Sequence, residues 1–255
     1  MEKILNKNQL KYITCKIVMS TSYFILTKLA NTDVADNTND DIINFSNKIS
    51  YVLPRNLLLC YADKGLFESY LIDWCKQYCS KDANILDIGA HTGSYALSLS
   101  SHCKKVYAFE PQKMTYYALC GGVALSNIRN VECINKGLGC QKQVGKKTLH
   151  IISNDGGGSS IHSSENEDLD TEEIEIVTLD SLNIENVSFI KMDVENNEQQ
   201  VLEGGLTTIK KCNYPHILFE CNDKEHHIQL FTFLEELNYS TVTINGVNNM
   251  YLAHH

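Results

Sequence analysis

The sequence predicts an α/β fold with a largely parallel sheet and helices on both of its faces. Short apolar runs alternate with longer amphipathic stretches over most of the chain, an order typical of parallel strands connected by helices. Two further strand candidates then follow each other around Asn245-Gly246. A loop this short cannot join parallel strands, so one strand at the end of the sheet must run antiparallel.

The periodicity of apolar residues places the individual elements. Phe67, Leu71, Trp74, Cys75 and Tyr78 recur at spacings of three and four, which indicates a helix at about 65–79. Compact apolar runs predict strands at Asn84–Ile88, Lys105–Phe109, Asn130–Lys136, Val187–Val194 and His216–Cys221. Amphipathic stretches predict helices at Gly93–Ser101, Lys113–Leu125, Glu198–Lys211 and Lys224–Leu237. The terminal strand pair is expected at Ser240–Asn245 and Met250–Ala253.

Residues 145–182 interrupt this order. Lys147–Ser153 and Ile174–Leu179 read as strands, and a glycine run at 156–158 lies between them. Ile161–Asp180 holds eight Asp or Glu residues and no Lys or Arg, a pattern for which we favour a solvated surface loop. The glycines give this segment backbone freedom beside the expected edge of the site.

Length and composition indicate one main domain with an N-terminal extension. The chain has 255 residues, of which 1–55 are expected to form the extension and 56–255 the main domain. Residues 31–41 are polar, acidic and rich in Asn, as in a linker. The apolar run at 17–27 is too short to span a bilayer and predicts a packed helix or strand rather than a signal sequence.

The charge balance disfavours a nucleic-acid partner and stable membrane insertion. Net charge is −9, whereas phosphate binding needs clustered Lys and Arg. Residues 1–30 carry five Lys and one Glu, most simply a solvated face, with a homodimer contact or a weak membrane-surface contact as alternatives. The ten cysteines form no CxxC pair and have no zinc spacing, so we expect free thiols in a reducing, cytoplasmic compartment.

A glycine loop follows the first strand of the main domain, where ligands bind in open α/β sheets. Asp87-Ile88-Gly89-Ala90-His91-Thr92-Gly93 has its two glycines four residues apart, unlike the dinucleotide pattern G-x-G-x-x-G, and this spacing disfavours a nicotinamide oxidoreductase. Such a loop suits an amino-acid moiety. Asp87 would either orient the loop or bind an ammonium group.

An acidic residue follows the second strand. Glu110 comes 21 residues after Gly89, the offset at which a carboxylate can accept hydrogen bonds from both hydroxyls of a ribose. An amino acid joined to a ribose is S-adenosylmethionine. The glycine loop and Glu110 together therefore predict an S-adenosylmethionine site.

Several motifs resemble the FkbM family of S-adenosylmethionine-dependent O-methyltransferases. They are ILDIGAHTGSYALSLS, VYAFEPQ, FIKMDVENNEQQVLEGG and HILFECN, in this order, and the resemblance runs from about Gly65 to the C-terminus. It implies a Rossmann-like class I fold with seven strands, the last antiparallel, over 56–255. It also implies a cofactor site at Asp87, Gly89, His91, Gly93 and Glu110, to which we add the neighbouring Ala90, Tyr95 and Pro111.

Two positions depart from the family pattern. His91 stands where the family usually has Asn, and either side chain can donate a hydrogen bond. Asn196 and Asn197 stand where Gly and a small residue typically follow Asp-Val-Glu.

Carboxylates at two strand ends are the candidate catalytic groups. Methyl transfer from a sulfonium mainly requires alignment, and a hydroxyl acceptor must also lose a proton. Asp193 and Glu220 end adjacent strands, and one of them is hypothesised to act as the base or to orient the acceptor. Glu195 is either a helix N-terminal carboxylate or a substrate ligand. Asp193, Glu195 and Glu220 could alternatively hold Mg²⁺, which we do not favour.

The 153–163 loop and the helix beginning near Phe67 are expected to form the acceptor pocket. Ser159, Ser160, His162 and Glu195 are the candidate substrate-binding residues, and His162 is either a general base or an exposed loop residue. His226 and His227 are interpreted as surface residues. His254 and His255 receive no role.

The preferred function is methylation of a hydroxyl on a small molecule. A sugar or glycosylated metabolite is the preferred acceptor, on the range of the family rather than on any residue here. One alternative is a catalytically silent module that binds a protein partner, which the intact glycines and Glu110 disfavour. The other is an RNA or cap methyltransferase, which the acidic balance disfavours.

Overall fold

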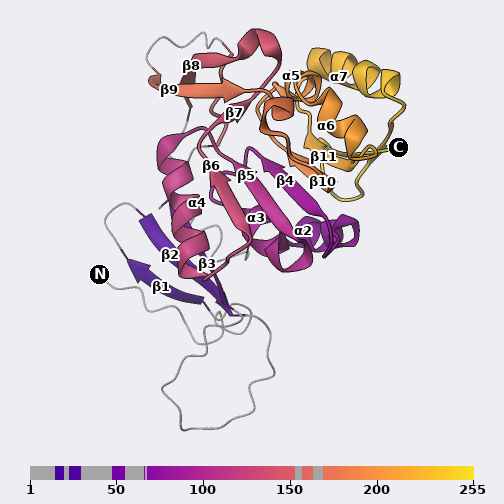
Figure 1. Ribbon diagram of the computed structural model, residues 1–255. Coiled ribbons are helices and arrows are strands. Elements are labelled where there is room, and N and C mark those ends of the chain that lie inside the picture. Colours follow the sequence, from indigo (N-terminus) through magenta and orange to yellow (C-terminus); the bar gives the residue numbers. More distant parts are fainter. Residues whose placement is uncertain are drawn as a thin grey trace.

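In the computed structural model, the chain forms a central α/β unit with two smaller sheets attached (Figure 1). The described residues are 15–19, 23–29, 48–54, 66, 68–152, 157–162 and 169–255. The predicted linker at 31–41 and Phe67 lie outside them. In the part of the chain that is described, no helix is both long and apolar enough to cross a bilayer.

The described residues form a central seven-stranded sheet in the order β12-β13-β11-β10-β4-β5-β6. Four neighbouring pairs from β11 to β6 are parallel, and β13 runs antiparallel to both of its neighbours. The expected mostly parallel sheet with an antiparallel last strand is therefore confirmed. The strands are β4 (Asn84–Ile88), β5 (Lys105–Phe109), β6 (Val131–Ile134), β10 (Val187–Met192), β11 (His216–Glu220), β12 (Ser240–Thr243) and β13 (Met250–His254).

Helices cover both faces of this sheet because successive strand residues point to opposite sides. Ile85 and Phe189 pack into one core with Leu71 and Leu97, and their neighbours Leu86 and Ile190 pack into the other. The helices of the first core are α2 (Ser69–Cys75), α3 (Ser94–Leu99) and α4 (Lys113–Leu125). Those of the second are α5 (Glu198–Glu203), α6 (Leu206–Lys211) and α7 (Lys224–Glu236).

The predicted helix at 198–211 is wrong in one respect, since two short helices stand in its place. The chain turns at Gly204, where a Cβ atom would lie 2.0 Å from the carbonyl oxygen of Gly139. Backbone thus packs directly on backbone at this point, and only glycine permits the approach.

A second sheet, in the order β7-β9-β8, is inserted between β6 and β10. Its strands are β7 (Gly137–Leu138), β8 (Gly145–Ile151) and β9 (Asp170–Val177). β9 begins at Asp170, four residues before the strand we expected at Ile174–Leu179, so this part of the acidic segment is strand rather than loop. Ile174 and Ile176 point inward, whereas Glu173 and Glu175 point outward to Lys146 and Lys136 at 2.7 and 2.6 Å. Alternation of side chains along a strand explains the pattern.

A third sheet is formed by β1 (Cys15–Met19), β2 (Tyr23–Leu29) and β3 (Lys48–Pro54), all antiparallel. Residues 17–19 and 23–27 of the apolar run thus take the strand alternative. β3 packs on α4 and contributes Tyr51 and Leu53 to the first core. The Ser50 amide donates to Ser126 Oγ at 2.7 Å, and the Tyr51 hydroxyl lies 2.6 Å from Ser98 Oγ. This part of the predicted extension is therefore docked on the main domain.

Gly204→Ala tests the backbone contact between α5 and the residues after β7. We expect the free energy of unfolding to fall by about 3 kcal/mol, because the new Cβ must displace the Gly139 carbonyl. Urea unfolding measures the change. Lys210→Ala, at an exposed position of α6, is the control and should change stability by less than about 0.5 kcal/mol. An unchanged midpoint for Gly204→Ala would contradict the contact.

Candidate active site

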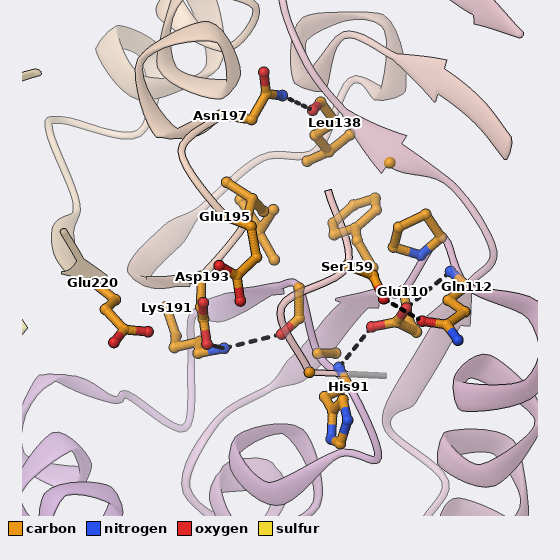
Figure 2. A pocket seen from close by; sticks show the side chains of 18 of the residues that line it. His91, Glu110, Gln112, Leu138, Ser159, Lys191, Asp193, Glu195, Asn197 and Glu220 are labelled. Carbon is orange, nitrogen blue, oxygen red and sulfur yellow. Dashed lines mark hydrogen bonds and ion pairs between the residues drawn. The ribbon is translucent and has the colours of Figure 1, made fainter. Parts of the chain in front are cut away.

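A cavity of about 390 Å³ opens at the carboxyl ends of β4, β5, β10 and β11. The inserted sheet closes one side of it with apolar side chains, and carboxylates gather at the other side (Figure 2). Lining residues include Glu68, Gly89, Ala90, His91, Tyr95, Glu110, Pro111, Gln112, Leu138, Leu149, Ser159, Ile174, Ile176, Lys191, Asp193, Glu195, Asn197 and Glu220.

The glycine loop leaves β4 in a left-handed conformation. Gly89 has φ +75°, and a Cβ atom there would lie 1.8 Å from the Asp193 carbonyl oxygen. Gly93 has φ +92°, but it packs against Leu97 and Leu119 rather than on the cavity. His91 has φ +50°, a region where both His and Asn are enriched, which accounts physically for the exchange with the usual Asn.

Asp87 lies beneath the loop and outside the cavity lining. Its Oδ2 accepts from the Ala96 amide at 2.8 Å, which ties the loop to α3. Burial raises its pKa to about 6, opposed by Lys191 and the Ala96 hydrogen bond. The geometry fits the loop-orienting alternative for Asp87.

Lys191 is a buried cation that the sequence reasoning missed. Its ammonium donates to the Gly89 carbonyl at 2.9 Å and lies 3.4 Å from the Asp193 carboxylate and 3.9 Å from that of Asp87. It also stands 5.3 Å from the centre of the Tyr95 ring. Burial opposes its charge, but Asp193 and Asp87 outweigh this effect and raise its pKa. A lone Lys inside an apolar strand was the available signal, because a lysine is almost never buried without a partner.

Glu110 is held by backbone donors at the edge of the cavity. Its Oε2 accepts from the His91 amide at 2.8 Å and its Oε1 from the Gln112 amide at 2.9 Å (Figure 2). Burial raises its pKa to about 7 despite these two hydrogen bonds. Each carboxylate oxygen keeps a second lone pair. This pair of acceptor oxygens fits the two hydroxyls of a ribose.

Four carboxylates gather at the other end, those of Glu68, Asp193, Glu195 and Glu220. Burial, Asp193 and Glu220 raise the pKa of Glu195 to about 7. Burial and Asp193 also raise that of Glu220, whose Oε1 accepts from Asn222 at 2.8 Å. Glu68, which the sequence reasoning missed, accepts from the Tyr95 hydroxyl at 2.6 Å. This end of the cavity favours a bound positive charge.

The family model described as the methyltransferase FkbM domain matches residues 87–241, more than half of the chain. The chain belongs to the FkbM methyltransferase family. Its sheet, glycine loop and helices are those of the Rossmann-like class I fold of S-adenosylmethionine-dependent methyltransferases. The expected family and fold class are both confirmed.

No curated protein matches the FkbM chain. Among solved structures, the methyltransferase FkbM from Methylobacillus flagellatus KT is similar at 16% identity and TM-score 0.46, over 69% of this chain and 44% of that one. This chain therefore spans less than half of that protein. A precorrin-6y C5,15-methyltransferase from Geobacter metallireducens GS-15 has 10% identity and TM-score 0.46 over 72% and 85% of the two chains. An rRNA methylase from Streptococcus thermophilus has 15% identity and TM-score 0.45 over 72% and 92%.

Only some of the predicted acceptor-binding residues of the FkbM domain line the cavity. Ser159 lines the cavity and donates to Gln112 Oε1 at 3.1 Å. Ser160 lies outside the lining, and its hydroxyl donates to the Glu195 carbonyl at 3.2 Å. His162 is exposed and does not line the cavity, so its surface-loop alternative fits the geometry. Residues 153–156 and 163 of the predicted loop lie outside the described residues.

We interpreted His226 and His227 of α7 as surface residues, but both pack against other side chains. His226 Nε2 lies 2.8 Å from Glu198 Oε2, and only 11% of its side chain is exposed. Glu198 Oε1 accepts from the Val194 amide at 3.1 Å, so the pair fixes the chain just after Asp193. His227 stacks on Phe231 with ring centres 3.7 Å apart. The partner of His226 lies on another helix, whereas His227 and Phe231 are four residues apart on α7, a spacing that predicts contact.

The carboxylates of the FkbM site do not form a metal-binding group in this geometry. Among the residues that the structure describes, no set of three or more His, Cys, Asp or Glu side chains is arranged to hold a metal ion.

Lys191→Met tests the buried cation. We expect the free energy of unfolding to fall by about 3–5 kcal/mol, because Asp87 is left buried without its charge partner. Lys136→Met is the matched control. Lys136 forms a partly exposed pair with Glu175, so its loss should cost less than about 1 kcal/mol. Urea unfolding compares both variants, and equal losses would contradict the role of Lys191.

Proposed function

We propose that this FkbM methyltransferase transfers the methyl group of S-adenosylmethionine to a hydroxyl of a small molecule, with a sugar or glycosylated metabolite as the preferred acceptor. One observation carries the proposal. The ribose-type carboxylate of Glu110 and the acidic end around Asp193 line one continuous cavity. This continuity supports a cofactor and an acceptor that bind within reach of one another.

Residues at one end of the cavity would hold the cofactor. Glu110 accepts from the ribose hydroxyls, and the backbone of Gly89 to His91 faces the amino-acid part. Pro111, Ile176 and Leu138 supply apolar surface for the adenine. When bound, S-adenosylmethionine supplies an electrophilic methyl group on a sulfonium. The carboxylates around Asp193 lower the energy of that cation.

Residues at the other end would orient the acceptor. Asp193 and Glu220 end adjacent strands, and one of them takes the hydroxyl proton while the other holds the acceptor. Glu220 suits proton uptake because burial and Asp193 raise its pKa. Glu195 at the same end, and Ser159 beside Gln112, also line the cavity and can hydrogen-bond further hydroxyls. A polyhydroxylated acceptor matches this set of oxygen acceptors.

The enclosure and charge of the cavity favour a small acceptor over RNA. The inserted sheet covers one side with Leu149, Ile174 and Ile176, and five carboxylates line the rest. Such a surface repels a phosphate backbone. The eight cysteines whose side chains the structure describes are free, which supports the proposed cytoplasmic location. The packing of Gly89 and the bonded state of Glu110 argue against a catalytically silent module.

Glu110→Ala tests the cofactor site. We expect calorimetric titration to show S-adenosylmethionine binding weakened by about 10- to 100-fold, since two hydrogen bonds to a charged group are lost. Glu132→Ala, which removes an exposed carboxylate on β6, is the control and should bind as wild type does. Methyl transfer to a panel of sugars, with and without Mg²⁺, then tests the acceptor class. Absence of binding to folded wild-type protein would overturn the proposal.

The affinity for S-adenosylmethionine should fall as pH falls from 8 to 6. The ribose binds the ionised carboxylate of Glu110, whose pKa in the free protein is about 7. Ionised Glu110 thus drops by about tenfold over this range, and the affinity with it. The stability of the ligand-free protein depends on pH with the opposite sign. Because the folded pKa is raised, this group stabilises the fold at low pH, and its contribution is lost as pH rises through 7.

Titrations at several pH values check this dependence. The dependence of log Kd on pH should be shallower in Glu110→Ala than in wild type. The smaller dependence that remains comes from Glu195, whose pKa is also raised to about 7. An unchanged slope in that variant would contradict the assignment of Glu110.

A further inference from the structure

The loop between β10 and α5 carries two carboxylates of the proposed site in a constrained backbone. Asp193 and Glu195 both belong to it, and Glu195 and Asn196 have φ values of +52° and +70°. Non-glycine residues in this region cost free energy that neighbouring contacts must offset. Something outside the loop must therefore hold it in place.

Asn197 joins this loop to the inserted sheet through both ends of its amide. Its Nδ2 donates to the Leu138 carbonyl on β7 at 3.1 Å (Figure 2). Its Oδ1 accepts from Gln143 Nε2 at 2.8 Å, and Gln143 lies on the 3-10 turn Gln141–Gln143. The Asn197 side chain is 3% exposed. A buried amide with both ends satisfied fixes one orientation of the groups it joins.

The two structures that Asn197 joins form different walls of the cavity. Leu138 pairs with Val177 and Gly137 with Ile176, so β7 carries β9 and its apolar residues with it. The β10–α5 loop carries the carboxylates. The width of the cavity between Ile176 and Glu195 thus depends on how these two parts are held together.

We propose that Asn197 is a positioning residue that makes the β10–α5 loop and the inserted sheet move as one unit. Occupation of the cavity beside Asp193 is then transmitted to the apolar wall formed by β7 and β9. The transmission step rests on the proposed function, whereas the connection between the two parts does not.

Asn196 supplies the matched control. It precedes Asn197 in the same loop, its side chain is exposed, and its left-handed φ is one that glycine adopts freely. Asn196→Gly therefore removes a neighbouring amide without touching the hydrogen bonds to Leu138 and Gln143.

Hydrogen exchange read by mass spectrometry tests the proposal, with and without S-adenosylmethionine. In ligand-free Asn197→Ala we expect the amides of β7 and β9 to exchange about tenfold faster, while β4 and β5 stay as slow as in wild type. S-adenosylmethionine should still protect residues 88–93 in this variant. It should protect β7 and β9 less than in wild type, because only its direct contacts with Leu138 and Ile176 remain. Gln143→Ala, which removes the partner from the other side, should shift β7 and β9 in the same direction if Asn197→Ala does not fold.

Three results would overturn the proposal. The first is unchanged exchange of β7 and β9 in ligand-free Asn197→Ala. The second is protection of these strands by S-adenosylmethionine that equals the protection in wild type. The third is an equal effect of Asn196→Gly and Asn197→Ala. If wild-type protein binds no S-adenosylmethionine, the proposed function fails, and the ligand-free comparison alone decides the role of Asn197.

Discussion

The buried ammonium of Lys191 is the contact on which the rest of the site depends. Lys191 lies opposite Asp87 in the parallel register of β10 and β4, so the two charges share one face of the sheet. The ammonium also holds the Gly89 carbonyl and the Asp193 carboxylate. A buried charge is tolerated only with such partners. The loop that would hold the cofactor and the strand end that carries Asp193 are thereby fixed relative to each other.

The cavity above this contact is graded in polarity. Apolar residues of the inserted sheet close one side, Glu110 lies at one end, and Glu195 and Glu220 lie toward the other end. Burial and the nearby Asp193 keep the pKa values of Glu195 and Glu220 high, so a bound cation would favour their ionised forms. The same arrangement that destabilises the free site at neutral pH would favour binding of a sulfonium.

Strands, helices and loop residues that depend on neighbours in the sequence could be predicted from spacing. β4, β5 and α4 have the bounds expected from periodicity, and Gly89 and Glu110 were found because they follow strands directly. Lys191 was passed over as one residue of an apolar strand, and Glu68 has no motif of its own. Asn197 was noticed only as a departure, since its partners Leu138 and Gln143 lie more than fifty residues away. Contacts across such separations cannot be read from spacing, and for the same reason His162 was placed in a site that it does not line.

A crystal structure of the protein with S-adenosylhomocysteine tests the proposed cofactor site. We expect the ribose hydroxyls to donate to Glu110, the amino-acid part to follow the Gly89 loop, and the sulfur to face Asp193. The Lys191 contacts to Gly89 and Asp193 should be unchanged. A ribose bound away from Glu110, or a ligand bound outside this cavity, would contradict it.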